Sequence, residues 1–200
     1  MSDAVAALNR GDVIVFPTET LYGMGADALN FTAVEKVFRL KGRDPNSPFP
    51  VLVSDQSMLD TLVVEISPLA AKLMARFWPG PLTLVLPGRH DLPLPLMNSA
   101  GGIGVRISSQ PIATELVRLL GRPITATSAN PSGQPGARTV AQARDYFSGK
   151  IDIFIDGGAL SARSASTVAE VIGDKIRIIR AGEIGIDQLE EVVGKGTVLP

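Results

Sequence analysis

The side chains of this chain that could do chemistry are gathered in short polar motifs between long apolar runs. They supply hydroxyls, an amide and several cations, and several of them come directly after an apolar run of the kind that forms a strand. The motifs are Phe16–Gly25, Lys41–Arg43, Gly104–Arg106, Thr127–Asn130, Ser166–Thr167 and Arg180–Gly182. Such groups, brought from strand ends into one crevice, suit a small substrate that carries phosphate and carboxylate.

The chain offers few groups for covalent or acid–base catalysis. It contains no cysteine, and its single histidine, His90, lies outside every motif. Most schemes that use a nucleophile, a general base or a zinc ion are therefore removed. Any catalysis is expected to come from binding and orientation of the reactants.

The motif Lys41-Gly42-Arg43 places two cations close together. The residues from 41 to 48 contain so many turn formers that we expect this whole stretch to be a loop. In an extended loop Lys41 and Arg43 point the same way, and a triphosphate between them would relieve their repulsion. The alternative is a solvated helix C-terminus, where basic residues meet the helix dipole. The motif lacks the spacing of a P-loop.

The stretch Thr18–Gly25 follows a buried strand and holds more special residues than a simple turn needs. We expect it to be a loop in which Gly23 and Gly25 permit close backbone approach to a ligand. Thr20 would present its hydroxyl from the same loop. A functional role is favoured over a plain turn here.

Ser128 and Asn130 follow another apolar strand. Their side chains could hydrogen-bond a ligand at the strand end. They could equally cap the turn that Pro131 and Gly133 demand. Taken alone, this motif favours the turn.

Arg106 falls inside the expected strand Ile103–Ile107. An arginine there must face solvent or find an acceptor, because burial without a partner is costly. A substrate carboxylate held by two parallel hydrogen bonds is one solution, and a structural ion pair is the other. Ser166, Thr167 and Arg180 also lie at expected strand ends, and each alone favours a structural role.

Apolar patterning predicts the elements that position these motifs. Strands are expected at Val13–Phe16, Pro50–Val53, Leu82–Leu86, Ile103–Ile107, Ile124–Thr127, Ile151–Ile155, Ser166–Ile172 and Lys175–Arg180. Helices are expected at 3–10, capped by Ser2 or Asp3, and at Thr32–Leu40, Pro68–Phe77, Pro111–Leu120, Val140–Phe147 and Ile186–Val193. The last six residues are expected to be frayed. Because helices and strands do not alternate strictly, we expect a single α/β domain over residues 1–200 with a mixed sheet.

The composition is that of an ordinary globular protein, with 45% hydrophobic residues, 20% charged residues and a net charge of −1. A protein that binds nucleic acid through bulk charge is usually basic, so the composition does not favour that role. The N-terminal residues lack the basic start and the apolar stretch of a signal peptide. No apolar run reaches the roughly 18 residues of a membrane span. The expected location is the cytoplasm, without a membrane partner.

Taken together, the motifs resemble those of the YrdC-like threonylcarbamoyl-AMP synthases. The chain contains, in the family's order, Phe-Pro-Thr-Glu-Thr-x-Tyr-Gly-x-Gly, Lys-x-Arg, Trp-Pro-Gly-Pro-x-Thr, Val-Arg, Ser-Ala-Asn, Ser-Thr-Val and Arg-x-Gly. The resemblance implies a twisted, mostly open α/β sheet with flanking helices and a large concave pocket. It also implies synthesis of threonylcarbamoyl-AMP and pyrophosphate from L-threonine, bicarbonate and ATP. This product serves the N6-threonylcarbamoyl modification of adenosine-37 in tRNA.

The resemblance assigns roles to residues by motif match. Threonine would be held by Thr20, Arg106 and Ser166, and Arg106 would take its carboxylate. ATP would be contacted by Lys41, Arg43, Ser47, Ser128, Asn130 and Arg180. Lys41 and Arg43 would be the catalytic cations. No clear protein ligands for a metal are present, so Mg²⁺ is expected to be held mostly by the phosphates of ATP.

Two positions depart from the family's pattern. Leu52 stands where some members carry a histidine that touches threonine, and Gly136 stands where some carry a serine. The chain otherwise resembles the short, single-domain form of the family. Its implied partners are the substrates and a downstream tRNA threonylcarbamoyl-transfer machinery, with weak tRNA binding as an open possibility.

Two rival functions stay open on this fold. YrdC-like modules also occur in carbamoyltransferases of hydrogenase maturation, within much longer chains that carry zinc-finger and acylphosphatase-like domains. A cysteine-free chain of 200 residues disfavours that function. The other rival is an RNA-binding module, which the near-neutral charge disfavours unless lysines and arginines cluster on one face.

Overall fold

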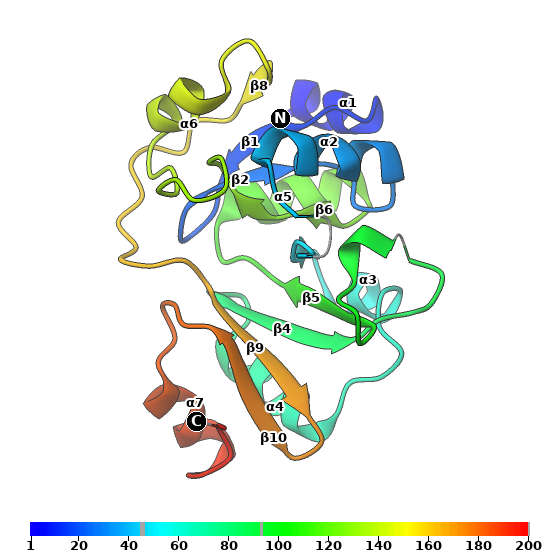
Figure 1. Cartoon of the computed structure of the whole chain (residues 1–200), viewed down its shortest axis with the longest axis vertical. Coiled ribbons are helices and arrows are strands. Elements are labelled where there is room, and N and C mark those ends of the chain that lie inside the picture. Colours follow the sequence, from blue (N-terminus) through cyan, green and yellow to red (C-terminus); the bar gives the residue numbers. More distant parts are fainter. Residues whose placement is uncertain (45–46, 93, 200) are drawn as a thin grey trace.

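The computed structural model describes residues 1–44, 47–92 and 94–199, and its strands form two open sheets (Figure 1). The four-stranded sheet, in the upper half of Figure 1, has the order β7 (Thr127–Ser128), β2 (Tyr22–Gly25), β1 (Ile14–Pro17) and β8 (Ile153–Phe154). The six-stranded sheet has the order β10 (Lys175–Arg180), β9 (Thr167–Ile172), β4 (Leu82–Pro87), β5 (Gly102–Arg106), β3 (Val51–Leu52) and β6 (Ile124–Thr125). Each sheet combines parallel and antiparallel neighbours. The expected mixed, open α/β fold is confirmed, with its strands divided between two sheets.

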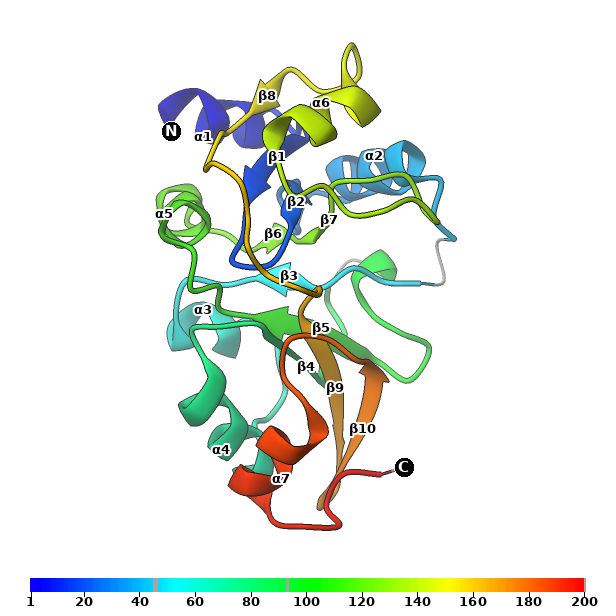
Figure 2. The same cartoon turned by 90° about the vertical axis from the view of Figure 1, so that its left-hand side faces the viewer.

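Helices flank both sheets (Figures 1 and 2). In the upper half lie α1 (Ser2–Asn9), α2 (Phe31–Lys41), α5 (Pro111–Leu120) and α6 (Val140–Phe147), and α1 and α5 pack together against β1. In the lower half, α4 (Pro68–Phe77) packs on α7 (Ile186–Val193) beside the six-stranded sheet, near the short α3 (Gln56–Asp60). A 3₁₀ turn covers Leu94–Leu96. None of the helices in the described parts of the chain is long and apolar enough to cross a membrane.

Buried apolar side chains form two clusters, with β1 between them. Ile14 and Phe16 belong to the smaller cluster, together with Leu8 and Leu116 of α1 and α5. Val15 belongs to the larger cluster. Side chains of a strand alternate between its two faces, so β1 is covered on both sides and reads as a continuous apolar run.

The expectation that Thr18–Gly25 is a loop is wrong for its second half. Residues Tyr22–Gly25 form β2, which pairs antiparallel with β1. A Cβ on Gly25 would lie 2.6 Å from the ring of Phe16 and 2.7 Å from the side chain of Ile124. The glycine at position 25 therefore allows close packing inside the core rather than approach to a ligand.

Lys41 does not belong to a loop either. It is the last residue of α2, and Gly42 ends the helix in the left-handed conformation with φ of 59°. The buried face of Val34, Val37 and Phe38 extends the helix to this point, and glycine is the usual residue for such a cap. Two members of the expected loop, residues 45 and 46, lie outside the described residues.

Other boundaries differ at the ends of elements. Helix α1 begins at Ser2 with Met1 as its N-cap, so neither Ser2 nor Asp3 caps it. The strand expected at 151–155 is limited to β8, and the short helix α3 was not expected. The C-terminal residues are not frayed up to Leu199, whose N–H donates to the Ile176 carbonyl at 2.7 Å. Pro200 lies outside the described residues.

The strand expected at Ile124–Thr127 is divided between the two sheets. Its first part is β6 of the six-stranded sheet, and its second part is β7 of the four-stranded sheet. Thr125 secures this passage, because its N–H donates to the Ala26 carbonyl at 2.9 Å and its hydroxyl accepts from the Ala26 N–H at 3.0 Å. The two sheets are therefore tied together by the chain itself and by a buried threonine.

We expect Thr125→Val to lower the free energy of unfolding by about 1–3 kcal/mol, because the buried N–H of Ala26 loses its acceptor. Equilibrium urea denaturation measures this loss. Thr61→Val is the matched control, since its hydroxyl bonds an exposed carbonyl that water can reach, and it should change the value by less than about 0.5 kcal/mol. Equal losses in the two variants would contradict the role given to Thr125.

Candidate active site

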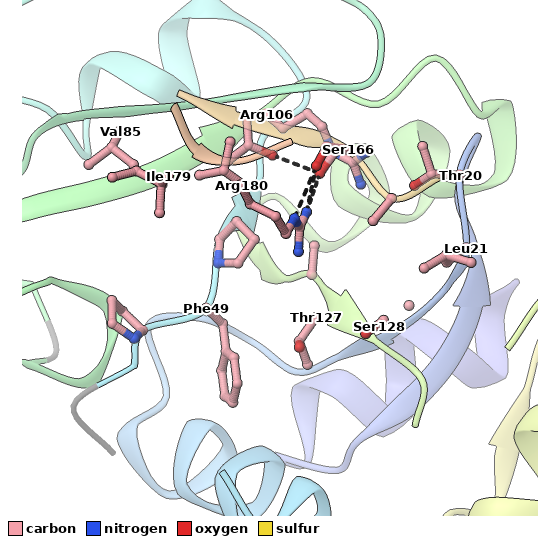
Figure 3. A pocket seen from close by; sticks show the side chains of 18 of the residues that line it. Thr20, Leu21, Phe49, Val85, Arg106, Thr127, Ser128, Ser166, Ile179 and Arg180 are labelled. Atoms are coloured by element: carbon pink, nitrogen blue, oxygen red, sulfur yellow. Dashed lines mark hydrogen bonds between the residues drawn. The ribbon is translucent and has the colours of Figure 1, made fainter. Parts of the chain in front are cut away.

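A cavity of about 480 Å³ lies between the two sheets (Figure 3). One side is formed by the β1–β2 loop and β7, the other by β4, β5, β9 and β10, and residues 47–50 lie along it. The expected site residues that line it are Thr20, Arg43, Ser47, Arg106, Ser128, Ser166 and Arg180. The volume falls in the range of ligand-binding cavities, roughly 300–1,000 Å³. The expected concave pocket is thus present, and it collects side chains from motifs far apart in the sequence.

Three arginines from different elements line this cavity. Arg43 follows α2, Arg106 ends β5 and Arg180 ends β10. Desolvation by the surrounding protein lowers the pKa of all three, and the charges of Arg106 and Arg43 lower the pKa of Arg180 further. The described residues that line the cavity include no carboxylate. This concentration of positive charge favours an anionic ligand.

Arg106 has a carboxylate partner that does not itself line the cavity. Its Nη1 donates to Glu19 Oε1 at 2.8 Å, and the two side chains are only 5% and 14% exposed. The second oxygen of Glu19 accepts from the hydroxyl of Ser108. Arg106 therefore forms a structural ion pair and also lines the cavity, so these two possibilities do not exclude each other. Glu19 was missed from the sequence, although it stands beside Thr20 in the first motif.

Arg180 is fastened to Ser166. Its Nη2 donates to the carbonyl of Ser166 at 2.7 Å and to the hydroxyl at 2.9 Å (Figure 3). Thr83, which is fully buried, lies with its Oγ1 3.2 Å from the same hydroxyl. Since an arginine only donates, the Ser166 hydroxyl keeps its proton for Thr83 or for a ligand. Thr83 was not singled out from the sequence, although it closes the Trp-Pro-Gly-Pro-x-Thr motif.

An irregularity in β10 directs Arg180 into the cavity. The register with β9 moves from Ile178↔Ala169 to Arg180↔Val168, which leaves Ile179 as an extra residue. As a result, Ile179 and Arg180 both line the cavity although they are neighbours in the chain. Bulges of this kind re-aim side chains next to functional sites.

Lys41 does not line the main cavity. Its side chain is buried, and its Nζ donates to the carbonyls of Ser128 at 2.6 Å and Asn130 at 2.7 Å. Burial lowers its pKa to about 8, with a further contribution from the charge of Arg43. Lys41 therefore fastens the segment 128–130 to the end of α2, and it does not project beside Arg43 from an extended loop as the sequence suggested.

A second cavity of about 350 Å³ shares part of its lining with the first. It is lined by Lys41, Gly42, Arg43, Asp44, Ser47, Ser128, Asn130, Ser132 and Gly133. Arg43, Ser47 and Ser128 line both cavities and so stand at their junction. The side-chain N–H₂ of Asn130 donates to two carbonyls, but its buried Oδ1 has no hydrogen-bond partner among the described residues. A buried acceptor of this kind calls for a donor from a ligand or water.

Thr18 fixes the loop that presents Thr20. The hydroxyl of Thr18 accepts from the N–H groups of Thr20 and Leu21, both at 3.2 Å, and donates to the Leu21 carbonyl at 2.7 Å. The Thr20 hydroxyl lies 3.1 Å from that of Thr18 and faces the cavity. The loop between β1 and β2 is therefore a hydrogen-bonded turn that presents the hydroxyl of Thr20 to the cavity.

The family model that covers the Sua5, YciO and YrdC proteins, described as telomere recombination, matches residues 6–182. The chain belongs to the Sua5/YciO/YrdC family. A threonylcarbamoyl-AMP synthase of Pyrococcus abyssi is 36% identical over 197 residues, which are 98% of this chain and 58% of the relative. A threonylcarbamoyl-AMP synthase of Bacillus subtilis is 37% identical over 195 residues, which are 97% of this chain and 56% of the relative.

A solved member of the family has the same fold. The crystal structure of P. abyssi Sua5 complexed with L-threonine matches with a TM-score of 0.94 at 36% identity, covering 99% of this chain and 58% of that one. This chain therefore spans a little more than half the length of these relatives.

The two departures from the pattern of the Sua5/YciO/YrdC family have structural explanations. Leu52 is 1% exposed in the smaller core cluster and does not line the cavity, so it acts in packing. A Cβ on Gly136 would lie 2.6 Å from a methyl group of Leu21, which itself lines the cavity. A serine at position 136 would therefore require Leu21 to move, and Leu21 occupies the space here.

We expect the free energy of unfolding to rise as the pH increases above about 8, because of Lys41. Its pKa is about 8 in the folded protein against 10.5 ordinarily, so the unfolded chain binds more protons between these values. From about pH 7 to about pH 9.5 this group should add about 2 kcal/mol. Urea denaturation at both pH values measures the gain, and Lys41→Gln should lose it. The same pH dependence in wild type and variant would refute this assignment.

Proposed function

We propose that this chain is a threonylcarbamoyl-AMP synthase, which converts L-threonine, bicarbonate and ATP into threonylcarbamoyl-AMP and pyrophosphate. The observation that carries the proposal is the convergence of Arg43, Arg106 and Arg180 on one cavity, beside the hydroxyls of Thr20 and Ser166. Several guanidinium groups in one place suit a reaction that brings a carboxylate and a triphosphate together. The names of the P. abyssi and B. subtilis relatives, and the complex of one relative with L-threonine, support it.

The threonine site of this proposal comprises Arg106, Thr20 and Ser166. Arg106 uses one N–H for Glu19, and its planar group can offer others to the amino-acid carboxylate. Thr20 supplies a hydroxyl from the loop between β1 and β2, and Ser166 supplies one from the residue before β9. A zwitterionic amino acid with a side-chain hydroxyl would find partners for each of its polar groups here.

The ATP site comprises Arg43 and Arg180 in the main cavity and Ser47 and Ser128 at the junction with the second cavity. Lys41 and Asn130 line the second cavity, where a chain of phosphates could extend. In this proposal Lys41 places a positive charge close to the phosphates. Its hydrogen bonds to two carbonyls also fix segment 128–130. Donors of the ligand, or its water shell, would satisfy the buried oxygen of Asn130.

The chemistry needs no protein nucleophile. The ammonium group of threonine first gives a proton to water. The neutral amine then attacks the carbon of bicarbonate, a C–N bond forms, and one oxygen leaves as water to give a carbamate. A carbamate oxygen then attacks the α-phosphorus of ATP, and pyrophosphate leaves with the electrons of the broken P–O bond. The protein has to juxtapose anions and neutralise the charge that develops on phosphate, and this is the role proposed for Lys41 and Arg43.

Magnesium enters this proposal as part of the substrate MgATP. No three His, Cys, Asp or Glu side chains lie together as a metal site in the part of the chain that the structure describes. The main cavity supplies cations and hydroxyls instead of carboxylates, and Asp44 is the single carboxylate among the described residues that line the second cavity. The ion would therefore be held through the ATP phosphates, which are the ligands that Mg²⁺ commonly uses in such sites.

The product would serve the N6-threonylcarbamoyl modification of adenosine-37 in tRNA, in the cytoplasm, and would pass to a downstream transfer enzyme. The net charge of −1 gives no bulk attraction for tRNA, so any direct contact with tRNA should be weak and sensitive to salt.

The decisive experiment is pyrophosphate release by the purified protein, with L-threonine, bicarbonate or Mg²⁺ omitted one at a time. We expect release only when all three accompany ATP, together with a threonylcarbamoyl-adenylate peak in mass spectrometry. Release that does not depend on threonine would indicate a different reaction. No release, combined with RNA binding that falls steeply with salt, would favour an RNA-binding module instead.

Two arginine variants should separate the two substrates. Arg43→Ala should raise the KM for ATP about tenfold or more, and Arg106→Ala should do the same for threonine, since each loses charge-assisted hydrogen bonds. Steady-state pyrophosphate release, with one substrate varied at a time, measures both constants. Arg39→Ala, on the exposed face of α2, is the matched control and should match the wild type. Equal effects of the two variants on both substrates would overturn this division of the cavity.

A further inference from the structure

Glu19 has no binding role in the function proposed above. Its carboxylate nevertheless connects two segments that carry proposed binding residues. Glu19 lies next to Thr20 in the loop that joins β1 to β2, two strands of the four-stranded sheet. Its partner Arg106 ends β5 in the six-stranded sheet. The ion pair therefore spans the two sheets at the edge of the cavity, between residues 87 positions apart.

The direction of the Arg106 guanidinium depends on this contact. Arg106 is 4% exposed, and its hydrogen bond to Glu19 is the one that its side chain makes to the described residues. A buried cation without a fixed acceptor is costly and would turn towards any available oxygen. The alternative anions in a working enzyme would be the phosphates that the proposed function places at Arg43 and Arg180, since Arg180 is close enough for the charge of Arg106 to lower its pKa.

Glu19 is itself held in place from the other side. The Ser108 hydroxyl donates to its second oxygen. That hydroxyl also accepts from the N–H of Gln110 at 3.2 Å, and the Ser108 carbonyl accepts from the Thr114 hydroxyl at 2.8 Å. The carboxylate is thus anchored to the segment just before α5 by a contact that does not involve Arg106.

We infer that Glu19 is a positioning residue that holds Arg106 for the carboxylate of the amino-acid substrate and keeps it away from the phosphates. This inference rests on the function proposed above. Glu19 uses one N–H of the guanidinium and leaves the other donors for the substrate. Its effect should therefore fall on threonine binding and leave ATP binding nearly unchanged.

The test uses Glu19→Gln, which keeps the size of the side chain and removes its charge. Calorimetry with L-threonine and with ATP, and the two KM values from pyrophosphate release, are measured for wild type and variant. We expect the Kd and KM for threonine to rise about tenfold, as for the loss of one charged hydrogen bond, with the ATP values within about twofold. Glu115→Gln, which breaks an exposed ion pair with Arg118, is the matched control and should change neither.

Two further variants separate positioning from a merely structural role. Ser108→Ala removes the hydroxyl that donates to Glu19 and accepts from the N–H of Gln110, and it leaves Glu19 and Arg106 themselves in place. We expect it to fold and to raise the threonine KM by about threefold. In the Arg106→Ala background, Glu19→Gln should add less than about twofold to the threonine KM, because the two residues act as one unit.

Three results would overturn the inference. Tighter threonine binding by Glu19→Gln would mean that Glu19 competes with the substrate carboxylate. Unchanged threonine affinity with lower stability would mean that Glu19 only supports the fold, and an equal loss for ATP and threonine would mean a general distortion of the cavity. If the wild type itself bound no L-threonine, that result would contradict the proposed function rather than the role of Glu19, so the two failures can be told apart.

Discussion

Four cations meet at the junction of the two sheets, and the fold has to provide an oxygen acceptor for each of them. Two, Lys41 and Arg106, are almost completely buried, where a charge without a partner is strongly destabilising. The acceptors are the carbonyls of Ser128 and Asn130 for Lys41, the carbonyl of Ser47 for Arg43, Glu19 for Arg106, and Ser166 for Arg180. The helix end at Gly42, the turn after β1 and the bulge in β10 all serve to bring these pairs together.

Part of this site could be predicted from the residues alone, because a polar stretch that follows an apolar run must leave the core where the run ends. Thr20 was placed in this way, whereas the resemblance to the family assigned Arg106, Ser166 and Arg180 to the site, and all four line the cavity. The same reasoning failed at Lys41. The glycine and prolines after it suggested a loop, but the buried face of α2 continues through Phe38 and keeps the helix intact to Lys41. Packing of a helix face outweighed the local signal of turn formers.

The relation between the two sheets could not be predicted, because the features that set it act over long separations in the sequence. Residues 124–127 read as one strand, and no local pattern says that β6 and β7 join different sheets. Nor does any local pattern pair Glu19 with Arg106, and the sequence could only leave open an ion pair or a substrate contact for that arginine. Both hold because a guanidinium has several donors, so one partner does not exhaust it.

In the proposed function, catalysis by orientation makes this relation between the sheets part of the chemistry. The proposed threonine contacts come from both sheets, with Thr20 on one side and Arg106 and Ser166 on the other. The proposed nucleotide contacts are divided in the same way, between Ser128 and Arg180. A shift of one sheet against the other would therefore displace both reactants at once, and a displacement of about 1 Å can lower a rate about a hundredfold. No nucleophile of the protein attacks either substrate in this proposal. The contacts that connect the two sheets, at Thr125 and at the Glu19–Arg106 pair, are therefore as important for the reaction as a catalytic side chain is in other enzymes.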